Sequence, residues 1–360
     1  LQLESEWRGG TLVYGADYYR DEVDSFRTDF NADGSLRGVR IQGPVGDDAT
    51  YETFGAFVQN QWEPAAGWEF TTGARFAAVD ASIGRVEDPA TGLPISIDDS
   101  WETVVFSGRA LRRINPCWNL FAGLSQGFRA PNLSDLSRLD SARSNEIETP
   151  SPGLDPEEFL SGELGARYEG DGGTLFVSVF YTDINDMIVR APTGNVIEGD
   201  NEVTKRNAGD GYVYGFEAGG EWEFLPQWTA FGHLAWIDGK VDSFPTSAPV
   251  AVEEPLDRLM PFTGRAGVRY GQDGWWVEGL VDFAAEADRL STRDKSDTQR
   301  IPPGGTPGYV IPTLRGGWQV TPDLLLTLAL ENLSDSDYRI HGSGVNEAGF
   351  NAILGARLEW

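Results

Sequence analysis

Metal binding is the chemistry that the residue types and spacing of this sequence suggest first. The stretch Asp29–Ser35, D-F-N-A-D-G-S, has oxygen ligands at alternate positions and glycine at position six, like the first half of a calcium loop. Position twelve is Arg40, where such a loop requires a bidentate glutamate. We therefore interpret the stretch as a turn built on aspartate and glycine, with calcium binding as the alternative.

Catalytic chemistry finds no support in the residue pattern. The two histidines are His233 and His341, no Gly-x-Ser-x-Gly motif occurs, and no paired carboxylates stand in an evident cleft. A net charge of -28 argues against a nucleic-acid partner, because phosphates require a basic surface. We predict neither an enzyme nor a bound cofactor.

The elements that must position any site are strands. In the last twelve residues the apolar side chains, among them Phe350, Leu358 and Trp360, fall on one face, and mostly polar ones fall on the other. In water such a strand would be an aggregation-prone edge, whereas in lipid the pattern suits a strand of a barrel. A sandwich strand with one wet face also alternates and stays as the alternative.

The same alternation recurs along the chain and predicts about fifteen strands in an up-and-down meander. Short turns alternate with long loops, and tryptophans stand beside the short turns, as in transmembrane barrels. We therefore predict that residues 1–360 form an all-β, transmembrane, up-and-down antiparallel barrel. The long loops are expected at residues 21–49, 80–101, 129–157, 190–207, 242–257, 288–307 and 334–347.

The odd strand count predicts an incomplete barrel. It makes the first and last strands run the same way, whereas single-chain bacterial barrels have even numbers of strands and begin at the inner side. We expect the C-terminal part of a larger barrel, with the last strand paired to the strand at Leu324–Leu330. The other edge of the last strand would then be free, and the sheet would be unclosed.

Four segments resemble, in the same order, segments of the TonB-dependent outer-membrane receptors. They are Gly127–Leu133 (G-F-R-A-P-N-L), Pro152–Glu157 followed by Glu163–Gly165, Val179–Ile188 followed by Tyr214–Glu217, and Glu331–Tyr338 (E-N-L-S-D-S-D-Y). With the terminal aromatic residue, the resemblance covers essentially the whole chain. It implies a barrel of about 22 strands around an N-terminal plug domain. By the pattern of that family, we expect this sequence to lack the plug and about seven of those strands.

The resemblance also implies a function and partners. The expected function is TonB-dependent uptake of a ferric siderophore or a similar scarce nutrient across the bacterial outer membrane. The partners would be outer-membrane lipid, the TonB complex acting through the missing plug, a small iron chelate, and the barrel-assembly machinery. That machinery would recognise Phe350, Leu358 and Trp360. A passive porin-like diffusion channel and a soluble all-β binding protein are the alternatives. Haem is disfavoured, because no histidine lies between Arg129 and Glu157.

Ligand contacts in such receptors come from the outer loops and the upper lumen. The candidates in this chain are Arg129, Arg138, Arg143, Asn145, Arg206 and Tyr212. Arginine would bind an anionic chelate through charge-assisted hydrogen bonds. The competing interpretation of each candidate is an ordinary loop residue, and we expect the Gly127–Leu133 segment to be architectural. Charged residues that alternate with the lipid-facing ones, such as Arg269, Glu278 and Arg315, are expected to face inward, toward the plug.

Overall fold

The computed structural model describes residues 1–7, 9–142 and 145–359, and nearly all of its regular structure is strand. In this described part the meander has the fifteen strands that the alternation predicts. They are β1 (Gln2–Trp7), β2 (Gly10–Val23), β5 (Asp47–Ala65), β6 (Trp68–Glu87), β7 (Pro94–Arg113), β8 (Trp118–Arg129), β11 (Glu157–Gly170), β12 (Gly173–Ile197), β13 (Asp200–Leu225), β14 (Trp228–Ser243), β16 (Thr263–Gln272), β17 (Trp275–Ala284), β18 (Tyr309–Thr321), β19 (Leu324–Glu331) and β20 (Asn351–Leu358).

The remaining elements lie in the long connections. They are the strands β3 (Thr28–Phe30), β4 (Leu36–Val39), β9 (Asp140–Ser141), β10 (Glu146–Glu148) and β15 (Val252–Pro255), and the helices α1 (Leu133–Ser137) and α2 (Thr292–Ser296). β3 and β4 form a small sheet of their own, and the other strands belong to one sheet. Within the described ranges, no helix is long and apolar enough to cross a membrane.

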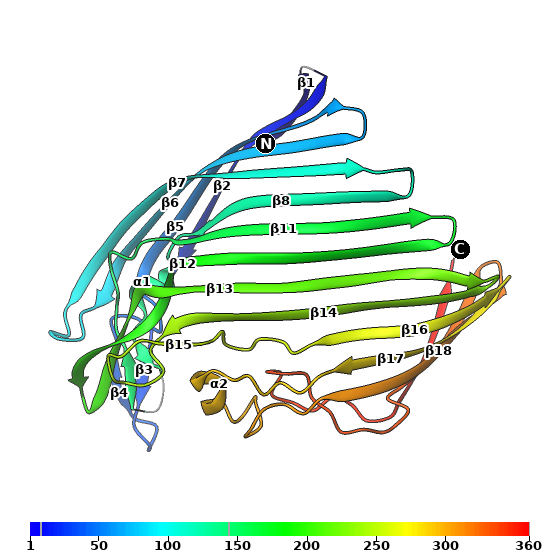
Figure 1. Ribbon diagram of the computed structural model, residues 1–360. Coiled ribbons are helices and arrows are strands. Elements are labelled where there is room, and N and C mark those ends of the chain that lie inside the picture. The colour runs from blue at the N-terminus through cyan, green and yellow to red at the C-terminus, as the bar shows by residue number, and fades with distance from the viewer. Residues whose placement is uncertain (8, 143–144, 360) are drawn as a thin grey trace.

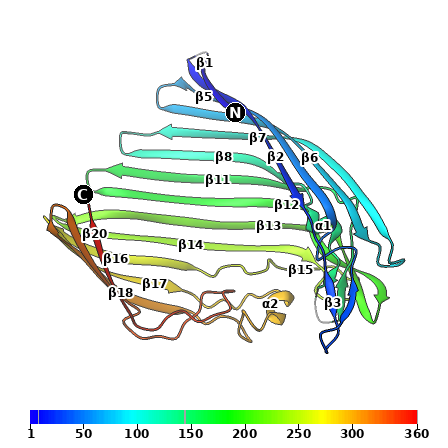
Figure 2. The same cartoon turned by 180° about the vertical axis from the view of Figure 1, so that it is seen from behind.

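Each strand of the meander pairs antiparallel with the next one, and the sheet curls round as Figures 1 and 2 show. The predicted partner of the last strand is confirmed, because β20 pairs with β19 from Leu324↔Leu358 to Glu331↔Asn351. Among the described residues, β1 pairs only with β2, and β20 pairs only with β19. The barrel wall is therefore unclosed, as predicted.

Aromatic side chains surround the end of the sheet that carries the short turns. Trp118, Tyr168 and Trp222 follow one another across three strands, with ring centroids 5.1 and 5.9 Å apart. Trp228, Tyr270 and Trp275 continue the row at 4.8 and 5.3 Å. Such a girdle marks the membrane–water interface of a transmembrane barrel.

The inner face of the sheet carries paired charges, as predicted. Glu278 on β17 is fully buried beneath two arginines, Arg269 Nη2 at 2.6 Å and Arg315 Nε at 2.5 Å. Beside this trio, Arg265 Nε lies 2.6 Å from Asp282 Oδ1. An arginine that faced lipid at mid-bilayer would cost about 2–4 kcal/mol, and the inward orientation of these side chains avoids that cost.

Two of the predicted long loops are wrong, because strands occupy them. β6 and β7 continue to Glu87 and from Pro94, so that only residues 88–93 turn between them. β12 and β13 likewise continue through the expected loop at 190–207. In β6 the apolar face changes sides: the inner residues Val79, Ala81 and Ile83 are apolar and are buried by another segment of the chain, whereas Asp80 and Ser82 between them are exposed.

That covering segment connects β8 to β11, and we call it the insert (residues 130–142 and 145–156 as described). Its side chains Ala130, Leu136 and Leu154 form a core with Ile83 and Trp101 of the inner wall. Trp101 Nε1 also donates to the carbonyl of Leu154 at 2.8 Å. Both views show α1 at the end of the sheet opposite the short turns. The insert therefore lies folded against the inner wall at the outer mouth.

Candidate ligand site at the outer mouth

The insert begins with a tightly capped helical turn. Asn132 Oδ1 accepts from the Asp135 amide at 2.9 Å, and Asp135 Oδ2 accepts from the Asn132 amide at 3.2 Å. This reciprocal pair is a capping box, and it satisfies two amides that a helix start leaves without partners. α1 then directs Leu136, which is fully buried, into the core. The Gly127–Leu133 segment is thus the point at which the chain turns inward.

Arg129 joins three elements and leaves no nitrogen free. Its Nε and Nη2 donate to the two carboxylate oxygens of Glu157 on β11 at 2.6 and 2.7 Å, and its Nη1 donates to Asp135 of α1 at 2.7 Å. Burial alone would raise the pKa of Asp135, but the bonds from Arg129 and the Asn132 amide, with the Lys205 charge, hold it below its usual range. The geometry gives Arg129 a structural role.

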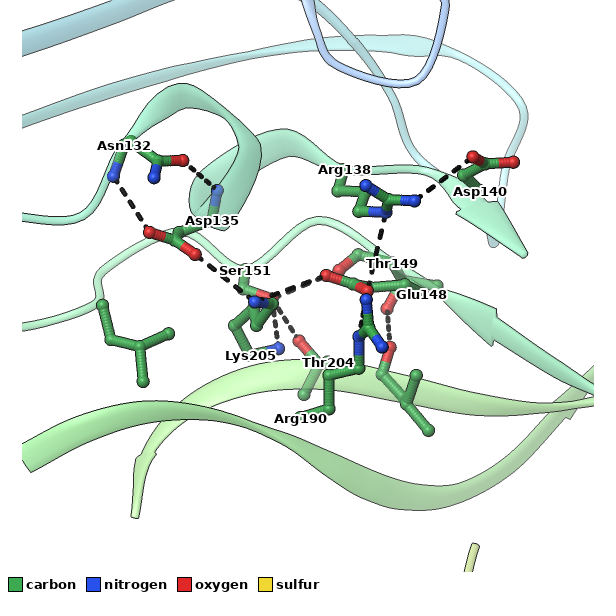
Figure 3. Close-up of polar contacts among 12 residues, drawn as sticks. Asn132, Asp135, Arg138, Asp140, Glu148, Thr149, Ser151, Arg190, Thr204 and Lys205 are labelled. Carbon is green, nitrogen blue, oxygen red and sulfur yellow. Dashed lines mark hydrogen bonds and ion pairs between the residues drawn. The ribbon is translucent and has the colours of Figure 1, made fainter. Parts of the chain in front are cut away.

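A second ion cluster surrounds Glu148 of β10, which is fully buried (Figure 3). Arg190 Nε on β12 lies 2.5 Å from its carboxylate, Arg138 Nε lies at 3.6 Å, and Lys205 Nζ on β13 lies at 3.9 Å. Lys205 also reaches Asp135 at 3.3 Å and so connects the two clusters. β10 runs parallel to β13, with Glu148 opposite Val203. The insert is thereby fixed to the barrel wall by buried charge as well as by its apolar core.

The structure brings only some of the predicted ligand residues together. Arg129 and Arg138 belong to the two ion clusters described above. Asn145 is exposed, and its carbonyl accepts from the Asn201 amide at 2.8 Å. Arg143 lies outside the described residues.

The other two candidates lie apart from the insert. Arg206 is exposed and points away from its neighbour Lys205 on the strand, to the other face of the sheet. Tyr212 stacks on Tyr181 and contacts Tyr214, each with ring centroids 6.0 Å apart, on the outer side of the wall. A ligand held at the inner mouth would not reach either residue.

Sequence reasoning missed the cations of a cavity beside the insert. This cavity of about 330 Å³ lies between the outer ends of β12–β14, β15 and α2. Its charged lining residues are Arg190, Lys205, Arg293, Glu254 and Asp257. Arg190 and Lys205 face each other across β12 and β13, in the stretch that was expected to be a loop. A larger hollow of about 1200 Å³ runs along the inner wall and includes Glu163, Arg167 and Glu217.

Helix α2 forms the far side of this cavity and is held firmly. Ser291 and Asp294 make a second capping box, and the buried Asp294 also accepts from the Arg258 amide at 3.1 Å. Glu254 accepts from the amide and the hydroxyl of Thr292. Nearby, His341 Nδ1 lies 2.9 Å from Thr306 Oγ1, and burial lowers the pKa of this histidine.

The Asp29–Ser35 stretch forms the β3–β4 hairpin. Asp29, the first ligand position of a calcium loop, is bound by Arg27 Nε and Arg40 Nε, both at 2.8 Å. Asp33 accepts from the amide and the hydroxyl of Ser35, at 2.9 and 2.6 Å, around a left-handed Gly34. These are the contacts of a turn. Throughout the described ranges, no group of three or more His, Cys, Asp or Glu side chains could hold a metal ion.

Known proteins with similar sequences include pesticin receptors. Residues 1–333 match the family model described as TonB dependent receptor-like, beta-barrel. The pesticin receptor of Yersinia enterocolitica is 26% identical over 316 residues, which cover 81% of this chain and 40% of that protein. The pesticin receptor of Yersinia pestis is also 26% identical, over 315 residues. The chain therefore spans less than half the length of these curated relatives.

Solved structures share the fold over the whole chain. The copper transporter OprC superposes with a TM-score of 0.78 at 18% identity, covering 99% of this chain and 55% of that one. The ferric yersiniabactin uptake receptor FyuA from Yersinia pestis gives 0.65 at 17% identity, covering 100% and 53%. Members of this family are receptors and transporters of the bacterial outer membrane that bind TonB and small ligands. The chain belongs to the TonB-dependent receptor family, and its residues form barrel wall of the kind that this family shares.

Proposed function

We propose that this chain is barrel wall of an outer-membrane receptor that takes up a ferric siderophore or a similar scarce nutrient in a TonB-dependent way. The names of its relatives support a metal chelate, since one similar structure imports ferric yersiniabactin and another is a siderophore receptor from Acinetobacter baumannii. The observation that carries the proposal is a cavity at the outer mouth whose lining includes three cations and two carboxylates, beside an insert that is fixed to the wall by buried charge and an apolar core.

The expected partners of this chain are inferred from the two faces of its sheet and from its last strand. The apolar outer face would contact membrane lipid, and the polar inner face would contact a plug domain through which the TonB complex acts. The barrel-assembly machinery would recognise the last strand. There, Leu358 ends β20 and is exposed, Phe350 precedes β20, and Trp360 lies outside the described residues.

The test is binding and uptake by cells that express the full-length protein and lack their own siderophore receptors. Outer-membrane vesicles would be titrated with a panel of ferric catecholate, hydroxamate, phenolate and carboxylate chelates, and with Cu²⁺. We expect saturable binding of at least one chelate, together with uptake that disappears when TonB is deleted. Uptake that does not saturate and persists without TonB would instead support the porin-like alternative. An absence of any saturable binding would refute the receptor function.

A further inference from the structure

The cavity between β12–β14 and α2 contains hydrogen-bond donors that no acceptor among the described residues uses. Arg190 donates through Nε to Glu148, and within the described ranges its two Nη groups have no partner. Lys205 Nζ makes one hydrogen bond, to Asp135 at 3.3 Å, and can offer two more protons. Both side chains are mostly buried, at 23% and 19% exposure. Donors in such a position favour an acceptor that enters from the cavity.

The third donor comes from the opposite side. Arg293 of α2 pairs with Asp257 through Nη1 at 3.0 Å, which leaves its Nε and Nη2 without a partner in the described part of the chain. Its side chain is 54% exposed, so it stands at the entrance rather than in the wall. Because Asp294 and Glu254 fix α2, Arg293 faces the Arg190–Lys205 pair across a preformed space.

We propose that this cavity is an anion subsite that binds a carboxylate arm of the imported chelate, an inference that rests on the proposed function. A guanidinium fork matches a carboxylate or a phosphate in shape. The three cations of the lining outnumber Glu254 and Asp257 by one, so that one singly charged carboxylate neutralises the cavity. The volume of about 330 Å³ is at the lower end of the roughly 300–1,000 Å³ of ligand pockets. The cavity therefore suits one arm, and the rest of the chelate lies toward the open mouth.

Arg293→Gln is the decisive variant, because this arginine is exposed and holds no buried carboxylate in place. Lys295→Gln is its matched control. It removes one exposed cation from the same helix, but Lys295 does not line the cavity. The probes are ferric citrate, which carries carboxylates, and ferric desferrioxamine B, a hydroxamate chelate without a free carboxylate. Binding to outer-membrane vesicles with the full-length protein would be measured at low and at high salt.

We expect the wild-type protein and Lys295→Gln to bind ferric citrate more tightly than ferric desferrioxamine B. Arg293→Gln should weaken ferric citrate binding by about 10-fold, as for the loss of one charge-assisted hydrogen bond, and should leave ferric desferrioxamine B unaffected. Equal ferric citrate affinities of Arg293→Gln and Lys295→Gln would overturn the subsite. Tighter binding of ferric desferrioxamine B than of ferric citrate would also overturn the subsite. The same holds if another chelate of the panel binds and ferric citrate does not. A failure of every chelate would instead refute the receptor function itself.

Discussion

Glu148→Gln tests whether buried charge fixes the insert to the barrel wall. The carboxylate is fully buried among Arg138, Arg190 and Lys205, and glutamine keeps its shape and an oxygen that Arg190 can still donate to. The substitution therefore removes the negative charge, replaces one acceptor oxygen by an NH2 donor, and leaves three cations close together. Removing one partner of a buried ion pair costs about 3–5 kcal/mol. Arg190 and Lys205 keep some access to water, so we expect a value near the lower limit, about 3 kcal/mol.

Hydrogen exchange of the insert amides is the appropriate assay, because the opening is local and global unfolding of a barrel would not report it. The Thr149 amide donates to Val203 O at 2.9 Å, and the Ser151 amide donates to Leu136 O at 2.8 Å. About 3 kcal/mol corresponds to roughly 100-fold faster exchange at these amides. Asp140→Asn is the control, since this carboxylate pairs with Arg138 at the surface and should change exchange by less than about 5-fold.

A double-mutant cycle separates the ion pair from other effects of the substitution. Arg190→Met should cost less in the Glu148→Gln background than in the wild type, because the buried charge that it would leave unpaired is already gone. The reasoning would be refuted if Glu148→Gln exchanged at the wild-type rate. Equal costs of Arg190→Met in both backgrounds would show that Glu148 and Arg190 are not coupled.

Three further predictions concern how closely the outer mouth is packed and how it responds to pH. Gly46→Ala should displace the insert and make it more sensitive to protease digestion, because a Cβ at this position would lie 2.3 Å from Ile83 Cγ2. Gly38→Ala is the control. A Cβ there has nothing within 4 Å, so the rate of digestion should not change. Since the pKa of Asp135 is lowered in the folded state, the charged side chain should stabilise the insert above about pH 4, and this contribution should be lost below that pH. Asp135→Asn should remove this part of the pH dependence of hydrogen exchange in the insert. The pKa of His341 is also lowered, so the protection of the Thr306 amide, relative to its intrinsic exchange rate, should decrease as the pH falls below about 6.5. His341→Asn, which cannot titrate, should remove that dependence.

The strands could be predicted because their signal is local. Period-two alternation needs only neighbouring residues, and it gave the fifteen-strand meander and the pairing of β20 with β19. It failed where the apolar face of a strand changes from the outer to the inner side of the sheet. Val79, Ala81 and Ile83 of β6 look like a break in the pattern, but they are a strand whose inner side is covered by residues far along the chain. Nothing in the sequence next to these residues indicates that a distant segment covers them.

The candidate site was less accessible to prediction, because it depends on pairings between distant residues. Arg129 and Arg138 could be named as candidates because they lie within and shortly after a recognisable segment. Arg190 and Lys205 were missed because they face each other only through the pairing of β12 with β13, which contains register shifts between Ile184 and Ile188. Their counter-ion Glu148 reaches them through a parallel pairing of β10 with β13, which joins residues more than 50 positions apart. A sequence contains no marker for such a contact.

The contrast between Arg129 and Arg190 indicates how a ligand arginine can be recognised in a receptor mouth that is crowded with charge. Both are arginines bound to buried carboxylates, and charge alone does not distinguish them. Arg129 uses all three of its nitrogens on Glu157 and Asp135, so a ligand could bind it only by breaking bonds that hold the insert. Arg190 uses one nitrogen on Glu148 and retains two at a cavity. Donors left over after structural pairing, rather than net charge, should therefore determine which cations of the mouth bind an anion.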